Sequence, residues 1–254
     1  MFIDSRVGQL IEPLTGRRWD AARVKIEIEA RVAQYHAAGL KHGDRVFILY
    51  GNNLEFFADL LAIWHLAATA IPLDARLTPR EIETLAKASK PKIALACGEV
   101  HSELSAIFQK TNTQVLLTPQ NPSKPKKAPY QDFTLDQDAL ILFTSGTTGN
   151  PKGVIHTHRS LRARWLSLRA ELGTERFERT LCLLPTHFGH GLICNALYPW
   201  LSGQDLHIVP PFKPELIMKL GSILDEYQIT FMSSVPSVWR LALKTSKKPQ
   251  KKTL

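Results

Sequence analysis

Short apolar runs alternate with amphipathic segments along most of this 254-residue chain, and this alternation restricts the fold more than any other feature. Apolar runs of about four to eight residues are typical of buried strands, whereas apolar residues recurring every three or four positions are typical of helices. Regular alternation of the two favours parallel strands covered by helices on both faces. The sequence therefore predicts an α/β fold with mainly parallel sheets flanked by helices.

The first part of the pattern predicts one α/β subdomain over residues 1–118. Val24, Ile28 and Val32 lie on one helical face, and Gly39 is well placed to end that helix. Thr78 and Pro79 are typical of a helix start. The predicted strands are 45–50, 69–71, 92–96 and 114–117. The predicted helices are 20–38, 53–67 and 78–89, and a further short helix lies between the last two strands.

A segment rich in proline and lysine, residues 119–131, interrupts the alternation and is predicted to be a linker or exposed loop. A second α/β unit follows over 132–243, and a basic tail over 244–254. The second unit has predicted strands at 139–144, 152–156, 180–184, 205–209 and 229–232. Its predicted helices are 159–172, 189–201, 214–227 and 236–243.

Composition excludes several classes of protein. A hydrophobic content of 44% with 22% charged residues argues against disorder and low complexity. Cys97, Cys182 and Cys194 form no CxxC pair, which indicates reduced thiols and a cytoplasmic location. The N-terminus lacks the pattern of a signal peptide. The longest apolar stretch, 56–73, contains Asp59 and His65, so we expect no membrane span.

The formal charge of +9 is concentrated outside the predicted folded units. Eight lysines in the linker and tail account for all but one of these excess charges: Lys124, Lys126, Lys127, Lys244, Lys247, Lys248, Lys251 and Lys252. A nucleic-acid surface needs basic residues spread over one folded face. We therefore expect solvated basic segments and no nucleic-acid partner, although the basic pI leaves nucleic-acid binding as an alternative.

A polar, glycine-containing loop after the strand 139–144 indicates chemistry. Glycine lets a backbone approach a ligand closely, and clustered N–H and hydroxyl groups form an anion-binding concavity. Lys152 adds a mobile positive charge. We expect this loop to hold a polyphosphate through Thr144, Ser145, Gly146, Thr147, Thr148, Gly149 and Lys152. It matches neither G-x-x-x-x-G-K-S/T nor G-x-G-x-x-G, and the alternative is a polar turn without a ligand.

The string Thr144-Ser-Gly-Thr-Thr-Gly-Asn-Pro-Lys-Gly153 resembles the phosphate loop of AMP-forming adenylating enzymes. This superfamily includes acyl-CoA synthetases, aryl-CoA ligases, adenylation domains of nonribosomal peptide synthetases and firefly luciferase. Weaker similarities occur in the family's order and cover most of the chain. They are 39–46, Ile71-Pro-Leu-Asp74, His156-Thr-His-Arg159, 184–192, Tyr227-Gln-Ile-Thr230 and Val235-Pro-Ser237.

The resemblance implies the fold of the first half of the large N-terminal domain of an acyl-CoA synthetase-like enzyme. It also implies an acid–thiol ligase, in which a carboxylate attacks the α-phosphorus of ATP and forms an acyl-adenylate. A thiol from CoA or from a carrier's phosphopantetheine then takes the acyl group. The loop would hold the β- and γ-phosphates, with Mg²⁺ bound mainly through phosphate oxygens.

The segment after Pro185 departs from a frequent family pattern, in which an aromatic residue stands two positions after this proline and a histidine three. Here His187 and Phe188 occupy these positions in the reverse order. The resemblance implies that His187 contacts the substrate carboxylate or phosphate and that Phe188 lines the acyl pocket. The alternative is that His187 and His190 are ordinary histidines of a loop or of a helix start. The sequence offers no further ligands that would make these two histidines a metal site.

Other candidates favour a structural role. Trp64 and His65 lie in an apolar helix and are predicted to belong to the core. Arginines after the phosphate loop could attract phosphates, but a solvated helix face is the simpler interpretation. These arginines are Arg159, Arg162, Arg164 and Arg169.

Several motifs of complete family members are not found in these 254 residues: the adenine-binding strand and loop, Y-G-x-T-E, a ribose-binding Asp and a C-terminal domain with a catalytic Lys. Three explanations stay open: an N-terminal fragment of a ligase, one half of a split enzyme whose second polypeptide completes the site, or a degenerate, noncatalytic protein that binds a nucleotide or phosphate or serves as a scaffold. The first two predict an exposed apolar face.

Overall fold

The computed structural model describes residues 7–119, 134–144, 152–210 and 214–251. The described residues form two compact units. The first comprises Arg23–Gly51 and Glu55–Ala163. The second comprises the residues before Arg23, Asn52–Leu54 and the chain from Arg164 onward. The predicted linker, 119–131, lies outside the described residues except for Pro119, and the predicted domain boundaries stay predictions.

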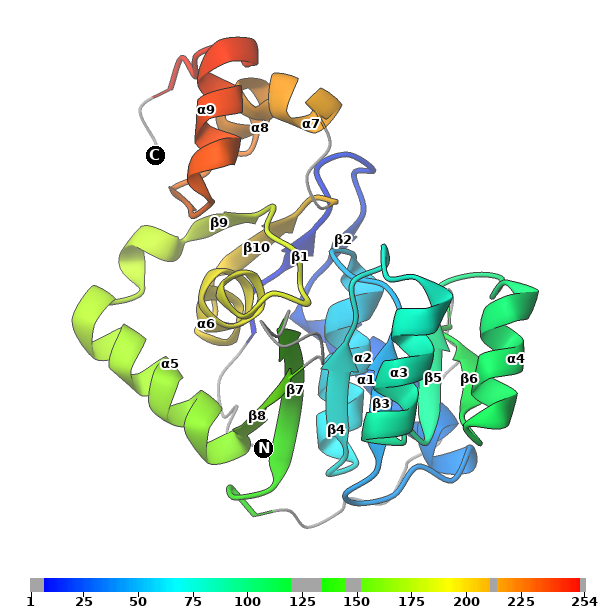
Figure 1. Cartoon of the computed structure of the whole chain (residues 1–254). Coiled ribbons are helices and arrows are strands. Elements are labelled where there is room, and N and C mark those ends of the chain that lie inside the picture. Colours follow the sequence, from blue (N-terminus) through cyan, green and yellow to red (C-terminus); the bar gives the residue numbers. More distant parts are fainter. Residues whose placement is uncertain (1–6, 120–133, 145–151, 211–213, 252–254) are drawn as a thin grey trace. The chain divides into compact units, whose positions relative to one another are not determined.

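The first unit is built on a six-stranded sheet with the order β6-β5-β3-β4-β7-β8 (Figure 1). All neighbouring strands are parallel except the last pair, β7 and β8. The strands are β3 (Arg45–Ile48), β4 (Thr69–Pro72), β5 (Ile93–Ala96), β6 (Gln114–Leu117), β7 (Asp138–Thr144) and β8 (Lys152–Thr157).

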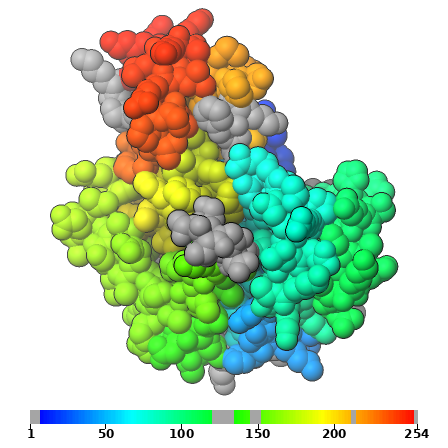
Figure 2. All heavy atoms as spheres, in the orientation of Figure 1, coloured from blue at the N-terminus to red at the C-terminus, as the bar shows by residue number. Residues whose placement is uncertain are grey.

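Helices cover both faces of this sheet. The chain steps from β3 to β4 and then back across β3 to β5, so right-handed crossovers place the two connecting helices on opposite faces. The helices are α1 (Ala21–Ala37), α2 (Leu54–His65), α3 (Pro79–Ser89) and α4 (Ser102–Lys110). In Figure 2 the side chains of α3 and α4, coloured cyan to green, lie side by side on the visible face.

Local signals read from the sequence explain the ends of two of these helices. Gly39 has a φ of 80° after α1, and the Leu40 amide donates to the carbonyl of Tyr35, which is a glycine-assisted helix end. The Thr78 side chain accepts from the backbone amide of Glu81, and the Glu81 carboxylate accepts from the Thr78 amide. This capping box confirms the predicted start of α3.

The second unit is built on a five-stranded sheet with the order β11-β9-β10-β1-β2. The strands are β1 (Leu10–Ile11), β2 (Arg18–Trp19), β9 (Arg179–Cys182), β10 (Asp205–Ile208) and β11 (Phe231–Met232). Only the hairpin pair β1–β2 is antiparallel. The sequence did not predict β1 and β2, because two-residue strands leave no period to detect.

The helices and short turns of the second unit differ in detail from their predictions. The predicted helix 189–201 consists of the π-helix η2 (His190–Leu197) followed by α6 (Tyr198–Leu201). The predicted helix 214–227 is divided into α7 (Pro214–Met218) and α8 (Leu220–Glu226), and α9 spans Pro236–Thr245. A 3₁₀ turn, η1 (Glu175–Phe177), precedes β9, and α5 (His158–Leu172) connects the two units along the chain.

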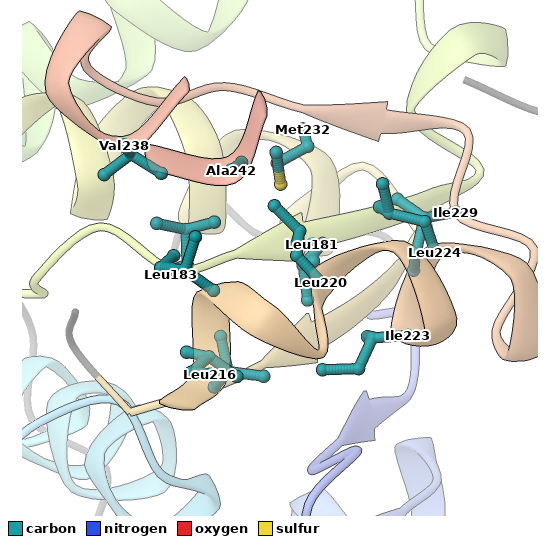
Figure 3. Packing of buried hydrophobic residues seen from close by; sticks show 12 residues of the cluster. Leu181, Leu183, Leu216, Leu220, Ile223, Leu224, Ile229, Met232, Val238 and Ala242 are labelled. Atoms are coloured by element: carbon teal, nitrogen blue, oxygen red, sulfur yellow. The ribbon is translucent and has the colours of Figure 1, made fainter. Parts of the chain in front are cut away.

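A hydrophobic core lies between the sheet of the second unit and the helices α7, α8 and α9 (Figure 3). Leu181 and Leu183 extend from β9 and the residues after it, toward Leu220 of α8 and Val238 of α9. Each fully buried Leu contributes roughly 1.5–3 kcal/mol relative to an exposed one. This cluster explains why two very short helices are stable at these positions.

The basic tail makes specific contacts over its described residues. The Ser246 hydroxyl accepts from the Gly221 amide at 2.9 Å, and the amides of Gln250 and Lys251 donate to the Asp225 carboxylate. In the part of the chain that the structure describes, no helix combines the length and apolar character needed to cross a bilayer.

Candidate active site

The predicted phosphate loop connects the two antiparallel strands of a hairpin. The last ladder pair joins Thr144 at the end of β7 to Lys152 at the start of β8, and the Thr144 hydroxyl donates to the Lys152 carbonyl at 3.4 Å. Both side chains are exposed. Ser145, Gly146, Thr147, Thr148 and Gly149 lie outside the described residues. The structure therefore brings the two ends of the loop together.

The position of Thr144 in the sheet suits ligand binding. β7 is parallel to β4, which is parallel to β3, so the carboxyl ends of all three strands lie at one edge. In α/β sheets ligands bind beyond this edge. The hairpin end thus lies at the edge where such sheets hold ligands.

His187 and Phe188 lie in the second unit, in the turn between β9 and η2. The Phe188 amide donates to the Pro185 carbonyl at 3.1 Å, which closes the turn. Thr186 is buried, His187 is half-buried and Phe188 is 47% exposed. β9, β10 and β11 are parallel, so this turn also lies at the carboxyl edge of its sheet.

His190 begins η2 and contacts the residues that follow β11. Its Nε2 lies 2.8 Å from the Ser233 hydroxyl, and its ring stacks against Phe188 with 6.4 Å between ring centroids. Within the described ranges, no group of three His, Cys, Asp or Glu residues is arranged to hold a metal ion. His187 lies in the turn before η2, and His190 is the first residue of η2.

Sequence reasoning missed Asn52, which contacts this same turn. Its buried carboxamide accepts from the Thr186 amide and donates to the carbonyls of Leu184 and Val209, each at 3.0 Å. The dipeptide Asn52-Asn53 after Gly51 indicates a turn. Its partners lie more than a hundred residues away, so no local pattern could have identified them.

The cysteines of the second unit are poor nucleophiles. Burial raises the pKa of the Cys182 thiol to about 12, and burial also raises the pKa of Cys194. Both thiols therefore stay protonated near neutral pH, and protonated thiols do not attack electrophiles efficiently. Cys97, Cys182 and Cys194, which all lie in the described residues, form no disulfide. The cytoplasmic location stays a prediction.

The remaining candidates have structural partners. Trp64 is buried and its indole N–H donates to the Ala139 carbonyl at 2.7 Å, which confirms its place in the core. Arg159 forms two hydrogen bonds with the exposed Asp136 carboxylate. The guanidinium of Arg169 lies 5.2 Å from the Trp165 ring centroid. Arg159, Arg162, Arg164 and Arg169 are all exposed, as expected for a solvated helix face.

The sequence model of the AMP-binding enzyme family matches residues 27–254. The chain belongs to this family. The resemblance found in the phosphate loop is thereby confirmed, and so is the predicted class of fold, with two mainly parallel sheets flanked by helices. This family assignment concerns the fold and the ancestry of the chain.

Several curated relatives are named CoA ligases. The mitochondrial malonate–CoA ligase ACSF3 of Bos taurus is 29% identical over 202 residues, which cover 77% of this chain and 34% of that protein. The probable CoA ligase CCL5 of Humulus lupulus is 27% identical over 266 residues, which cover 96% of this chain and 48% of that protein. The chain thus spans half or less of the length of these family members.

Solved structures share the fold. Apo MatB from Rhodopseudomonas palustris superposes with a TM-score of 0.80 at 24% identity, covering 95% of this chain and 49% of that one. The o-succinylbenzoate CoA synthetase MenE of Bacillus subtilis, in complex with the acyl-adenylate intermediate OSB-AMP, gives 0.80 at 21% identity, covering 95% and 62%. At these identities the likeness concerns the fold.

Proposed function

We propose that this chain takes part in the ATP-dependent activation of a carboxylic acid to an acyl-adenylate, followed by transfer of the acyl group to the thiol of CoA or of a carrier's phosphopantetheine. The observation that carries the proposal is the hairpin of β7 and β8. It holds Thr144 and Lys152 at the carboxyl edge of a parallel sheet, at the two ends of a segment rich in glycine and hydroxyl groups.

The chemical role of the hairpin follows from the charge on ATP. Attack of a carboxylate on the α-phosphorus brings negative groups together and transfers charge to the departing pyrophosphate. The Lys152 ammonium and the hydroxyls of Thr144, Ser145, Thr147 and Thr148 would bind the β- and γ-phosphate oxygens and stabilise that charge. Mg²⁺ would bind chiefly through phosphate oxygens, since it keeps several waters and needs few protein ligands.

His187 and Phe188 are proposed to contact the acid. A neutral imidazole has one N–H donor, which would orient the carboxylate oxygen for attack. The exposed ring of Phe188 would cover the acyl group. Holding the carboxylate in an attacking geometry lowers the barrier by reducing the entropy lost in the reaction step.

The full reaction is proposed to require polypeptide beyond these 254 residues. The family resemblance implies that adenine and ribose contacts, together with a C-terminal catalytic lysine, come from segments whose motifs are not found here. A longer chain or a second polypeptide would supply them. The alternative function is noncatalytic binding of a nucleotide or phosphate that acts through a partner. It would need only the phosphate loop, which lies within these 254 residues.

Calorimetric titration of the chain with ATP and Mg²⁺ tests the phosphate-binding step. Lys152→Ala should weaken binding about tenfold or more, because a hydrogen bond to a charged group contributes roughly 1.5–3 kcal/mol. Ser145→Ala/Thr148→Ala should weaken it further. Lys110→Ala, at the exposed end of α4, is the matched control. Equal ATP affinity in the wild-type protein and in all three variants would contradict a role for the hairpin.

Pyrophosphate exchange separates the two proposed functions. The chain is incubated with ATP, labelled pyrophosphate and each member of an acid panel containing malonate, a medium-chain fatty acid and an aromatic acid. Acid-dependent exchange that is lost in Lys152→Ala supports adenylation. ATP binding without exchange supports the noncatalytic alternative, and the absence of both contradicts the family's chemistry in this chain.

A further inference from the structure

The carboxamide of Asn52 uses its polar atoms in one compact contact. Nδ2 donates to the carbonyls of Leu184 and Val209, and Oδ1 accepts from the Thr186 amide, each at 3.0 Å. Asn52 is 4% exposed. A primary amide offers two N–H donors and a carbonyl acceptor, and each of these groups is bonded here. Rotating the amide by 180° would set donor against donor, so this orientation is chemically unique.

The three partners of Asn52 come from two neighbouring strand ends. Leu184 and Thr186 follow β9, and Val209 follows β10. The connections after these strands step in opposite directions, through η2 and α6 in one case and through α7 and α8 in the other (Figure 1). In α/β sheets ligands bind at this carboxyl edge. The Asn52 side chain bonds across the two strand ends at this position.

The backbone that carries Asn52 is itself held in place. Asn52 has a φ of 54°, in the left-handed region that asparagine tolerates better than most residues. Two residues later, the Leu54 amide donates to the carboxylate of Glu12 at 3.1 Å. Glu12 is buried, follows β1, and also accepts from the Thr15 hydroxyl at 2.7 Å. The N-terminal hairpin therefore anchors the segment 52–54.

The turn contacted by Asn52 is confined from the helix side as well. A Cβ atom at Gly191 would lie 2.6 Å from the Pro185 carbonyl oxygen and 2.8 Å from the Leu184 Cβ. Only glycine permits η2 to approach the turn this closely. The turn from Leu184 to Thr186 is thus held between the first turn of η2 and the Asn52 carboxamide.

From these contacts we infer that Asn52 is a positioning residue, which holds the 184–186 turn so that His187 and Phe188 are presented in one orientation for the acid substrate. The role of His187 in this inference rests on the proposed function. The contact between Asn52 and the 184–186 turn is independent of that function. Asn52 reaches no reacting atom and acts through the turn. Its loss should therefore change His187 and the use of the acid while leaving ATP binding intact.

The first test uses Asn52→Ala and Asn52→Asp in the full chain. The aspartate variant keeps an acceptor for the Thr186 amide but sets a carboxylate against two carbonyls. Asn112→Ala is the matched control, because Asn112 is also left-handed, with a φ of 53°, and is exposed after α4. The readouts are amide hydrogen exchange of Thr186 and the NMR signals of the His187 imidazole.

Asn52→Ala should speed exchange of the Thr186 amide about tenfold or more relative to the Leu206 amide, and should shift the His187 signals. Leu206 donates to the Gln9 carbonyl in the same unit and reports general loosening. Asn52→Asp should show a smaller increase, and Asn112→Ala none. Unchanged Thr186 exchange, or equal acceleration of Thr186 and Leu206 with unchanged His187 signals, would overturn the inference.

Two further measurements keep the inference testable if the Asn52 variants fail to fold or if the wild-type chain has no turnover. In the wild-type protein the Thr186 amide and the Asn52 carboxamide protons should exchange slowly, and exchange at the rate of an unfolded chain would overturn the inference. Where the wild-type chain exchanges pyrophosphate, Asn52→Asp should change the acid's KM or kcat with the KM for ATP unchanged. Absence of pyrophosphate exchange in the wild-type chain would count against the proposed function. The NMR result would still decide the role of Asn52.

Discussion

At the scale of single residues, the first unit holds a buried group of charges between α1 and α2. Arg31 is fully buried, bonds to the carboxylates of Glu27 and Asp59, and lies 3.1 Å from the Pro119 carbonyl. Asp59 also accepts from the Tyr35 hydroxyl at 2.7 Å. Charges in a dry interior are tolerated only when paired and hydrogen-bonded, so every member depends on the others.

Arg31→Leu should lower the free energy of unfolding by about 3 kcal/mol or more, because it leaves the buried Asp59 carboxylate without its counter-ion. Glu27 would keep its second ion pair, with Arg23 at 2.6 Å. Urea denaturation followed by circular dichroism measures this change. Arg76→Ala is the control, since Arg76 pairs with Asp74 at the surface with 82% of its side chain exposed. That variant should show little change. Similar losses in both variants would contradict the dependence on burial.

His207 of β10 makes the stability of the second unit depend on pH. It is 2% exposed, and burial lowers its pKa from 6.5 to about 4. The unfolded chain binds a proton near pH 6.5, whereas the folded chain does so only near pH 4. The stabilisation is therefore complete above pH 6.5 and is lost as the pH falls toward 4.

Between pH 7 and pH 5 this effect amounts to about 2 kcal/mol of unfolding free energy. His207→Phe should remove that share of the pH dependence, measured as the difference between denaturation midpoints at the two pH values. His36→Gln, at an exposed position of α1, should leave the wild-type pH dependence unchanged. If His207→Phe and wild type lose equal stability on acidification, His207 is not the responsible group.

At the scale of elements, local signals determine where helices begin more reliably than where they end or divide. The capping box of Thr78 and Glu81 lies in four consecutive residues, so the sequence predicts it directly. The division of the predicted helix 214–227 into α7 and α8 has no local signal of that kind. Both short helices are stabilised by the shared core of the second unit, and their leucines meet strand residues far away in the sequence (Figure 3).

Thr78→Ala should lower the free energy of unfolding by about 1 kcal/mol, because it removes the side-chain acceptor at the start of α3. Thermal or urea denaturation measures the loss. Thr78→Ser should retain most of the wild-type stability, since serine supplies the same acceptor. Glu83→Ala serves as the control. It removes only the surface ion pair of the half-buried Glu83 with Lys87, and should change stability little. A Thr78→Ala variant as stable as wild type would show that α3 is fixed by packing alone.

At the scale of the whole molecule, the charge is unevenly distributed along the chain. Eight lysines of the segments 119–131 and 244–254 carry nearly all of the excess positive charge, and the remaining sequence is close to neutral. Long-range attraction to polyanions scales with the number of cations that can reach phosphates. Weak binding of nucleic acid by this protein would therefore come from these two segments.

Replacing those eight lysines by glutamine should abolish most retention of the chain on double-stranded DNA at low salt. In the wild-type protein the logarithm of affinity should fall with the logarithm of salt concentration by about 0.9 for each phosphate contact. Fluorescence anisotropy measures both quantities. DNA affinity that survives the eight replacements, with its salt dependence intact, would instead indicate a basic surface on the folded units.

The strands, the class of fold and the family were predictable because neighbouring residues encode them. Apolar runs predicted the strands around Phe47, Leu140 and Leu181, and the alternation predicted parallel sheets covered by helices. The loop from Thr144 to Lys152 indicated the family, because its glycines, hydroxyls and lysine are contiguous. Each of these signals has a period or a spacing within about twenty residues, which is the range over which sequence patterns are informative.

Tertiary structure alone decided which distant residues meet. The chain forms two sheets whose strand orders differ from their order in the sequence, and β1 enters the second sheet from the N-terminus beside β10. Asn52 bonds to Leu184 and Val209, across 132 and 157 residues, because three carbonyl and amide groups converge where two parallel strands end. Buried polar groups form hydrogen bonds with the groups that the fold places beside them, and no local sequence pattern identifies these partners.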